Sequence, residues 1–102
     1  MNRPTTRFLD AVVTTWETVS TASAAACQST IKRTGDDAKL TIDIQTPQFT
    51  ATIAAWEQVY CLDITLFERA TGSGAELSAG ECTSLEEMQE RITLLCEMLT
   101  PK

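Results

Sequence analysis

The chain of 102 residues holds few side chains able to do acid, base or nucleophilic chemistry, and it contains no histidine. The commonest general base is therefore missing, together with every Cys-His or Ser-His pair. Adjacent carboxylates occur at Asp36-Asp37 and at Glu86-Glu87. The first pair lies in a turn sequence and the second at a helix start, where solvation and capping explain them. We therefore expect no catalytic residues and no enzymatic activity.

Metal and cofactor chemistry has equally little support. The four cysteines are 34, 21 and 14 residues apart and form no C-x-x-C pair: Cys27, Cys61, Cys82 and Cys96. We interpret them as small buried residues of a protein in a reducing compartment, rather than as zinc ligands or a disulfide framework. The stretch Gly72-Ser73-Gly74 lacks the lysine of a phosphate-binding loop and is more typical of a hairpin connection. The sequence thus predicts neither a metal ion nor a cofactor.

The length corresponds to one domain with one core, residues 1–102. No apolar run approaches the roughly 18 residues that a membrane-spanning helix needs, and the first residues do not resemble a signal peptide. We therefore expect a cytoplasmic protein.

Charge is distributed unevenly along the chain. Residues 1–39 hold four acids and five bases, a net charge of +1, whereas residues 40–102 hold ten acids and three bases, a net charge of −7. Phosphate backbones and anionic membranes are poor partners for such a surface, because both are bound by clustered Lys and Arg. A basic protein would be attracted to it, although the same charge also serves solubility.

Hydrophobic periodicity predicts a helix near each end of the chain. Apolar residues recur at helical spacing after the possible caps Thr5 and Thr6: Phe8, Leu9, Val12, Val13, Trp16 and Val19. The alanines at 24–26 allow this helix to continue through Cys27. Near the C-terminus, Ser84 and Glu87 form a capping box, and an apolar stripe follows from it: Leu85, Met88, Ile92, Leu95 and Leu99.

Between the helices the period changes to two, which predicts four strands. The first three place Leu40, Ile42 and Ile44, then Ile53, then Leu62 and Ile64 on one face. A weaker fourth strand is expected from about Ala75 to Cys82, with Leu77 and Ala79 on the buried side. The predicted fold is a single α+β domain, a two-layer sandwich of an N-terminal helix, a four-stranded antiparallel meander and a C-terminal helix.

If both helices cover one sheet face, the other face is open. Alternation directs aromatic, hydroxyl and carboxylate side chains toward that face, namely those of Asp43, Thr52, Trp56, Asp63, Thr65 and Phe67. Exposed aromatic residues beside carboxylates are typical of recognition surfaces. The alternative is a local register break at Trp56 that tucks the indole into a sheet edge.

Part of the chain resembles a known family. The run Phe49–Ile64, with Trp56-Glu57 followed by Cys61, then Thr71-Gly72 and the helix start Thr83–Met88, resembles the TriTu-type immunity proteins. Those proteins are encoded beside Rhs polymorphic toxins and neutralise an ADP-ribosyltransferase toxin domain that modifies elongation factor Tu. The similarity covers about half the chain, and the first 39 residues show no such match.

The resemblance implies an immunity protein that binds a basic toxin domain as a monomer in a 1:1 complex and occludes its active site. The residues expected to contact the toxin are Asp43, Trp56, Glu57, Asp63 and Phe67. One alternative is a type III secretion chaperone, which is also small, acidic and α+β. Another is a small enzyme or metabolite-binding domain, which needs a pocket with convergent polar groups.

Overall fold

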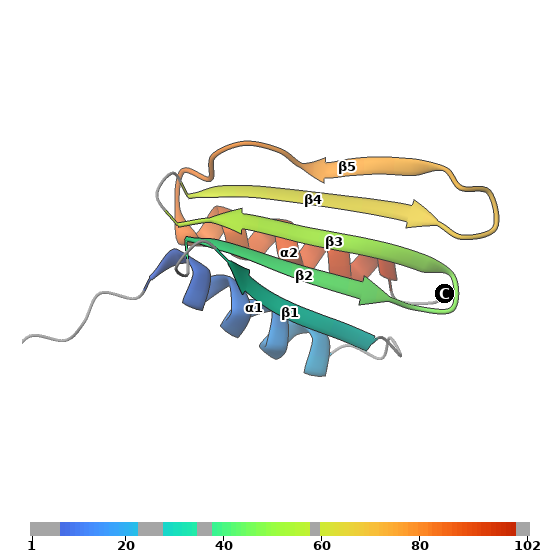
Figure 1. Ribbon diagram of the computed structural model, residues 1–102, viewed down its shortest axis with the longest axis horizontal. Coiled ribbons are helices and arrows are strands. Elements are labelled where there is room, and N and C mark those ends of the chain that lie inside the picture. The colour runs from blue at the N-terminus through green and yellow to red at the C-terminus, as the bar shows by residue number, and fades with distance from the viewer. Residues whose placement is uncertain (1–6, 23–27, 35–37, 58–59, 100–102) are drawn as a thin grey trace, which may run out of the picture.

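The structure, a computed structural model, describes residues 7–22, 28–34, 38–57 and 60–99. Within these ranges the chain forms two helices and one five-stranded antiparallel sheet (Figure 1). In chain order the elements are α1 (Phe8–Ala22), β1 (Gln28–Thr34), β2 (Lys39–Gln45), β3 (Phe49–Trp56), β4 (Cys61–Glu68), β5 (Gly74–Ser78) and α2 (Leu85–Leu99). The strands lie in the sheet in the same order, so each pairs with its neighbours in sequence.

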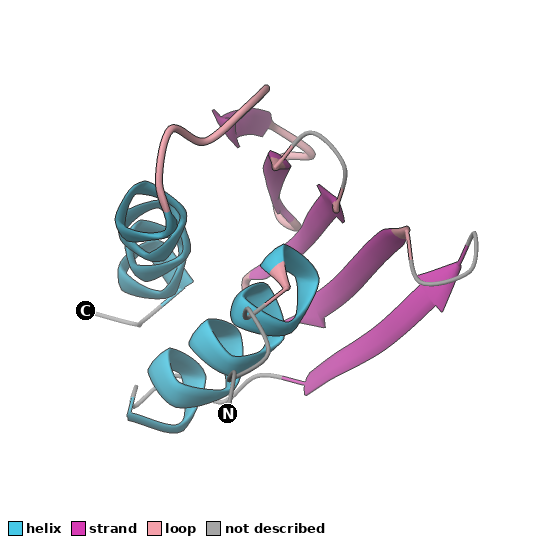
Figure 2. Ribbon diagram, turned by 90° about the vertical axis from the view of Figure 1, so that its left-hand side faces the viewer, coloured by secondary structure: helices cyan, strands magenta, loops and turns pink. Residues whose placement is uncertain are grey.

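Both helices lie on the same side of the sheet, where they also pack against each other (Figure 2). The α+β two-layer architecture predicted from the sequence is therefore confirmed, with five strands in place of four. Between the layers, the inward residues of β2, β3 and β4 are at most 1% exposed at six positions: Leu40, Ile42, Ile44, Ile53, Leu62 and Ile64. These are the positions that the period-two pattern predicts as inward.

Strand β1 is the element missed in the sequence. Its residues pair with β2 over their whole length, from Gln28 opposite Gln45 to Thr34 opposite Lys39. The extension of the first helix through Cys27 falls on residues 23–27, which lie outside the described residues, and Gln28 already belongs to a strand. All seven residues of β1 are exposed, so no apolar alternation marks them as a strand.

The last strand ends earlier than predicted, at Ser78, and its burial differs from the alternation. The pairing changes between Ile64 opposite Ser78 and Thr65 opposite Glu76, which leaves Leu77 as the extra residue of a β-bulge. The bulge turns Ser78 inward, whereas Ala79, predicted to be buried, is exposed. The Ser78 hydroxyl donates to the Leu62 carbonyl over 2.8 Å, so its inward position leaves no unsatisfied donor.

Helix α1 buries the apolar stripe predicted for it. Phe8, Leu9, Val12 and Trp16 are at most 2% exposed, while Val13 and Val19 are partly buried against the same core. The buried Trp16 indole N–H donates to the Ser29 hydroxyl of β1 over 3.3 Å, which satisfies its one donor. The proposed caps Thr5 and Thr6 lie outside the described residues.

Helix α2 begins at the predicted Ser84–Glu87 pair, with the Glu87 side chain bonded to the amide of Thr83 instead of that of Ser84. The Glu87 amide donates to the Ser84 hydroxyl over 3.1 Å, and the Glu87 carboxylate accepts from the Thr83 amide over 3.0 Å. Met88, Ile92, Leu95 and Leu99 are buried, whereas Leu85 is 37% exposed and does not belong to the core stripe. Within the described residues, neither helix is long and apolar enough to cross a membrane.

Candidate protein-binding surface

In the part of the chain that the structure describes, neither helix covers the second face of the sheet, and the strand register fixes which residues lie on it. Side chains from four neighbouring strands form cross-strand rows, such as Thr30, Asp43, Thr52 and Thr65. The rows are rich in threonine and carry few apolar groups. We call this surface the open face; all of Asp43, Thr52, Trp56, Asp63, Thr65 and Phe67 lie on it, as predicted.

Trp56 lies at one end of the open face, in regular register. It is opposite Lys39 on β2 and Cys61 on β4, so the alternative of a register break is wrong. The Lys39 ammonium group is 5.1 Å from the centroid of the indole ring, a cation–π distance. The indole is half-buried. The indole therefore has one described side-chain contact on the open face and keeps part of its surface exposed.

Asp63 is the predicted carboxylate that lies nearest to Trp56 in the ladder. It is opposite Ala54 and is therefore the diagonal neighbour of Trp56, at roughly 7–8 Å between backbones. Its carboxylate accepts from the Gly80 amide over 3.1 Å and from the Cys61 thiol over 3.9 Å. Asp63 thus joins the open face to the loop before α2. We call Lys39, Trp56, Cys61 and Asp63 the Trp56 cluster.

Asp43 and Phe67 belong to the open face but not to the Trp56 cluster. Asp43 lies near the middle of β2, where it accepts weakly from the Thr52 hydroxyl over 3.5 Å. Phe67 is six residues from Cys61 along β4, about 20 Å at the rise of a strand. The two aromatic residues therefore stand at opposite ends of the face and do not form one hydrophobic anchor.

The Phe67 ring also has a structural role. It lies across Gly74 of β5, where an added methyl group would overlap two of the ring carbons. Aromatic rings commonly cover a glycine on a neighbouring strand in this way. The ring is still 47% exposed, so one side of it is open to a partner.

Glu57 does not lie on the open face, which corrects its assignment as a contact residue. Its carboxylate accepts from the Phe8 and Leu9 amides, over 2.8 and 3.2 Å, and pairs with the Arg7 guanidinium at 3.4 Å. A carboxylate in this position caps the N-terminus of α1, where the helix dipole favours negative charge. The residues are 48 and 49 positions apart in sequence, so no local pattern signals the contact.

A second surface, on α2, was not singled out from the sequence. Three carboxylates line a shallow groove of about 490 Å³ on the outer side of the helix, together with Leu94: Glu86, Glu90 and Glu97. Within the described residues, none of the three forms an ion pair. Leu94 and Met98 are 44% and 42% exposed beside them. The acidic excess of the chain was the available signal, and the helical spacing of these residues would have placed them together.

The cysteines are mainly structural. Cys82 and Cys96 are buried, as predicted, whereas Cys61 is half-buried on the open face and Cys27 lies outside the described residues. Burial, followed by the charge of Asp63, raises the pKa of the Cys61 thiol above its ordinary value, so it is a poor nucleophile at neutral pH. Among residues 7–22, 28–34, 38–57 and 60–99, no group of three or more acidic and cysteine side chains is placed to hold a metal ion.

Comparisons with protein-family models, with curated proteins and with solved structures found no match for this chain.

Proposed function

We propose that this chain is a cytoplasmic immunity protein that binds a toxin domain and neutralises it. The observation that carries the proposal is the open face, a side of the sheet that neither described helix covers and that carries Trp56 beside Lys39. The resemblance of residues 49–64 to the TriTu-type proteins supplies the class of partner, an ADP-ribosyltransferase toxin domain. Partner binding suits this surface because an uncovered sheet face presents contact area for another protein.

The charges favour a basic partner. The open face carries Asp43 and Asp63, the outer side of α2 carries Glu86, Glu90 and Glu97, and the chain has a net charge of −6. A toxin cleft that receives an anionic dinucleotide presents basic groups, which carboxylates can engage. We propose that Trp56 anchors the contact and that Asp63 pairs with one of those basic groups, so that the bound chain blocks access to the toxin's active site.

The partner itself is found by a pull-down. The tagged chain is used as bait in the native cytoplasm, and bound proteins are identified by mass spectrometry. Each is then expressed alone and together with this chain. We expect a basic domain that stops growth alone and is harmless with the chain; a secreted effector that is harmless in both cases would instead support the chaperone.

The surface is tested with the double variant Trp56→Ala, Asp63→Asn, because asparagine keeps an acceptor for the Gly80 amide. We expect at least about a 30-fold loss of toxin affinity, the effect of losing one interface hot spot. Gln45→Ala, at the opposite end of the open face, is the matched control. Circular dichroism checks that both variants are folded, and unchanged affinity of the double variant would remove the Trp56 cluster as the contact.

A further inference from the structure

The two edges of the sheet differ in how they are protected. At one edge, β5 has five residues and carries the bulge at Leu77. At the other, β1 has seven residues in unbroken register, without proline, glycine or bulge. Sheet edges are usually blunted against pairing with another chain, and β1 carries two charged residues of this kind, Lys32 and Arg33, of which Arg33 is paired with Asp10. The edge of β1 is therefore competent to accept another strand.

The ladder defines which backbone groups of β1 remain available. The Glu57 amide donates to the Ala38 carbonyl over 3.0 Å and the Thr46 amide to the Phe49 carbonyl over 2.8 Å, so the even-numbered residues of β2 bond to β3. Because ladder bonds alternate, the odd-numbered residues of β2 bond to β1. Their partners there are residues 28, 30, 32 and 34. The backbone groups of Ser29, Ile31 and Arg33 consequently point to the open edge.

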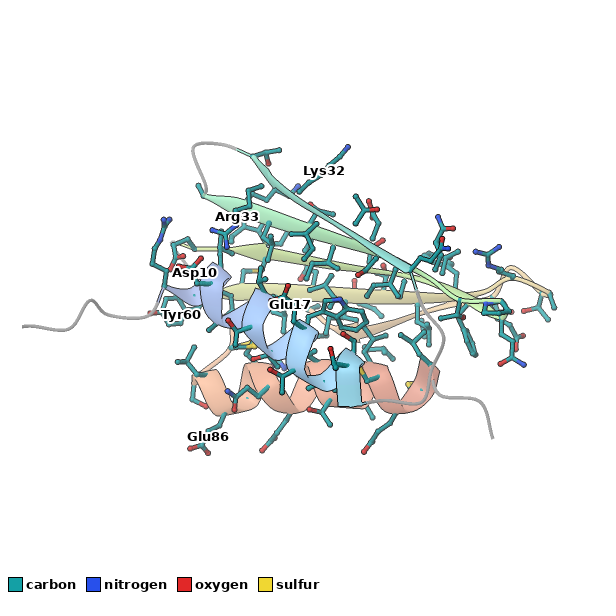
Figure 3. All side chains as sticks on the ribbon, turned by 90° about the horizontal axis from the view of Figure 1, so that it is seen from below. Asp10, Glu17, Lys32, Arg33, Tyr60 and Glu86 are labelled. Atoms are coloured by element: carbon teal, nitrogen blue, oxygen red, sulfur yellow. The ribbon has the colours of Figure 1, made fainter. Side chains whose placement is uncertain are left out.

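The side chains of these three residues face the helix side of the sheet. Arg33 pairs with Asp10 of α1 at 2.7 Å (Figure 3). Ser29 accepts from the Trp16 indole. Between them Ile31 remains 38% exposed, since α1 does not cover it. Among the described residues, no further strand bonds to this edge, so it presents three pairs of backbone groups available for pairing around one partly exposed apolar side chain.

We propose that this edge pairs with the same edge of a second copy of the chain. In an antiparallel arrangement centred on Ile31, Ile31 lies opposite Ile31 of the second copy, and Ser29 lies opposite Arg33 in both directions. All three pairs are of the hydrogen-bonded kind, so they exchange two bonds each, six in all. The side chains of both isoleucines then meet on the helix side and shield each other from water.

Charge does not block self-association at this edge, because β1 carries Lys32 and Arg33 and no acid, and Arg33 is paired with Asp10. Residues 1–39, which include β1, have a net charge of +1, whereas the rest of the chain has −7. In the proposed register Lys32 lies opposite Thr30, so no like charges are directly opposed. The product is one continuous sheet of ten strands with all four helices on one side, which joins the two open faces. It departs from the monomer expected from the sequence, and it does not depend on the identity of a toxin.

The association is measured by light scattering over a dilution series of the purified chain. We expect the mass to rise from 11.2 kDa toward twice that value with concentration. Ile31→Pro removes an amide that points away from β2, so it deletes pairing between copies and keeps the β1–β2 ladder. We expect this variant, and Ile31→Lys, to stay at 11.2 kDa, and the conservative Ile31→Val to behave as the parent chain.

The register is tested with cysteines at positions 30 and 32, in a background where Cys27 and Cys61 are serine. Opposed residues 30 and 32 form a non-hydrogen-bonded pair, whose backbone spacing of about 4.5 Å permits a disulfide. We expect the Thr30→Cys, Lys32→Cys variant to give a crosslinked dimer on oxidation. Each single variant should give none, because the same position in the two copies is related diagonally and is too distant for a disulfide. A mass of 11.2 kDa at every concentration would overturn the proposal, as would a dimer that survives Ile31→Pro or crosslinks through one cysteine alone.

Discussion

At the scale of single residues, Glu57 shows how a functional interpretation and a structural one compete for the same side chain. It follows Trp56 in the segment that resembles an immunity family, yet its carboxylate caps the first turn of α1. The side chain is 20% exposed, so its contacts are partly shielded from water. Its contribution is to stability, because it joins the helix layer to the end of β3.

Replacing Glu57 with alanine leaves the amides of Phe8 and Leu9 without their acceptor. We expect the free energy of unfolding to fall by about 1–2 kcal/mol, the usual effect of losing a helix cap. Glu57→Gln keeps an acceptor and loses only the charge, so the expected loss is smaller, about 0.3–1 kcal/mol. Urea denaturation measures both, with Glu76→Ala on the exposed edge of β5 as the control. Equal stability of Glu57→Ala and the parent chain would show that the cap contributes nothing.

The buried Cys82 thiol makes stability depend on alkaline pH. Burial raises its pKa above the ordinary value of 9.0, with a smaller opposing influence from the positive charge of Arg91. The folded state therefore retains the thiol proton at pH values where the unfolded chain loses it. This contribution to stability is full below pH 9.0 and is lost as the pH rises through the higher pKa of the folded state.

We expect the free energy of unfolding to decline above pH 9.0 and the decline to be shallower in Cys82→Ala. The comparison is made by urea denaturation in a Cys61→Ser background, so that the pKa of the second thiol does not contribute. Alanine lowers stability at every pH by removing buried volume, and only the slope reports the thiol. Parallel pH profiles for the two proteins would contradict the proton linkage.

At the scale of elements, the hydrophobic pattern predicts the strands that have a buried face and misses the strand that has none. Strands β2, β3 and β4 alternate because one side of each faces the helices, so Ile42 or Ile64 can be placed without a structure. Strand β1 buries no residue and is defined by its hydrogen bonds to β2, which leave no trace in its composition. The bulge in β5, which shifts burial from Ala79 to Ser78, also arises from the pairing between strands and leaves no signal in the composition.

The candidate surface was likewise predictable where it depends on alternation and unpredictable where it depends on strand pairing. Alternation places Trp56 and Asp63 on the open face, but their mutual proximity and the distance of Phe67 depend on the register between strands. The acidic side of α2 adds a second element-scale feature. Glu97 lies in the last turn of that helix, and this turn contains no basic residue. The negative end of the helix dipole disfavours a carboxylate at this position.

Charge reversal at the two ends of α2 should have opposite effects. We expect Glu97→Lys to raise the free energy of unfolding by about 0.3–1 kcal/mol and Glu86→Lys, in the first turn, to lower it by a similar amount. Both variants change the net charge equally, so each is the control for the other. Thermal denaturation at low salt measures the pair. Shifts of the same sign would mean that net charge, and not the helix dipole, dominates.

At the scale of the whole molecule, the three surfaces have different characters. The outer side of α2 is acidic, the open face is rich in threonine, and the edge strand β1 carries two bases and no acid. The core lies under β2, β3 and β4, and neither edge strand contributes more than a few buried groups. Stability is therefore concentrated in the middle of the sheet, while both proposed contacts use groups outside that core.

This distribution predicts a pattern of amide hydrogen exchange. We expect the bonded amides of β3, which has a strand on each side, to exchange through global unfolding. In a dilute solution of the chain, the β1 amides of Thr30, Lys32 and Thr34 should be protected from exchange. Those of Ser29, Ile31 and Arg33 should exchange fast, because only the first set bonds to β2. Exchange measured residue by residue checks the alternation. Uniform exchange along β1 would show that the strand detaches from β2 as a unit, and the backbone pattern from which its open edge was derived would then not persist in solution.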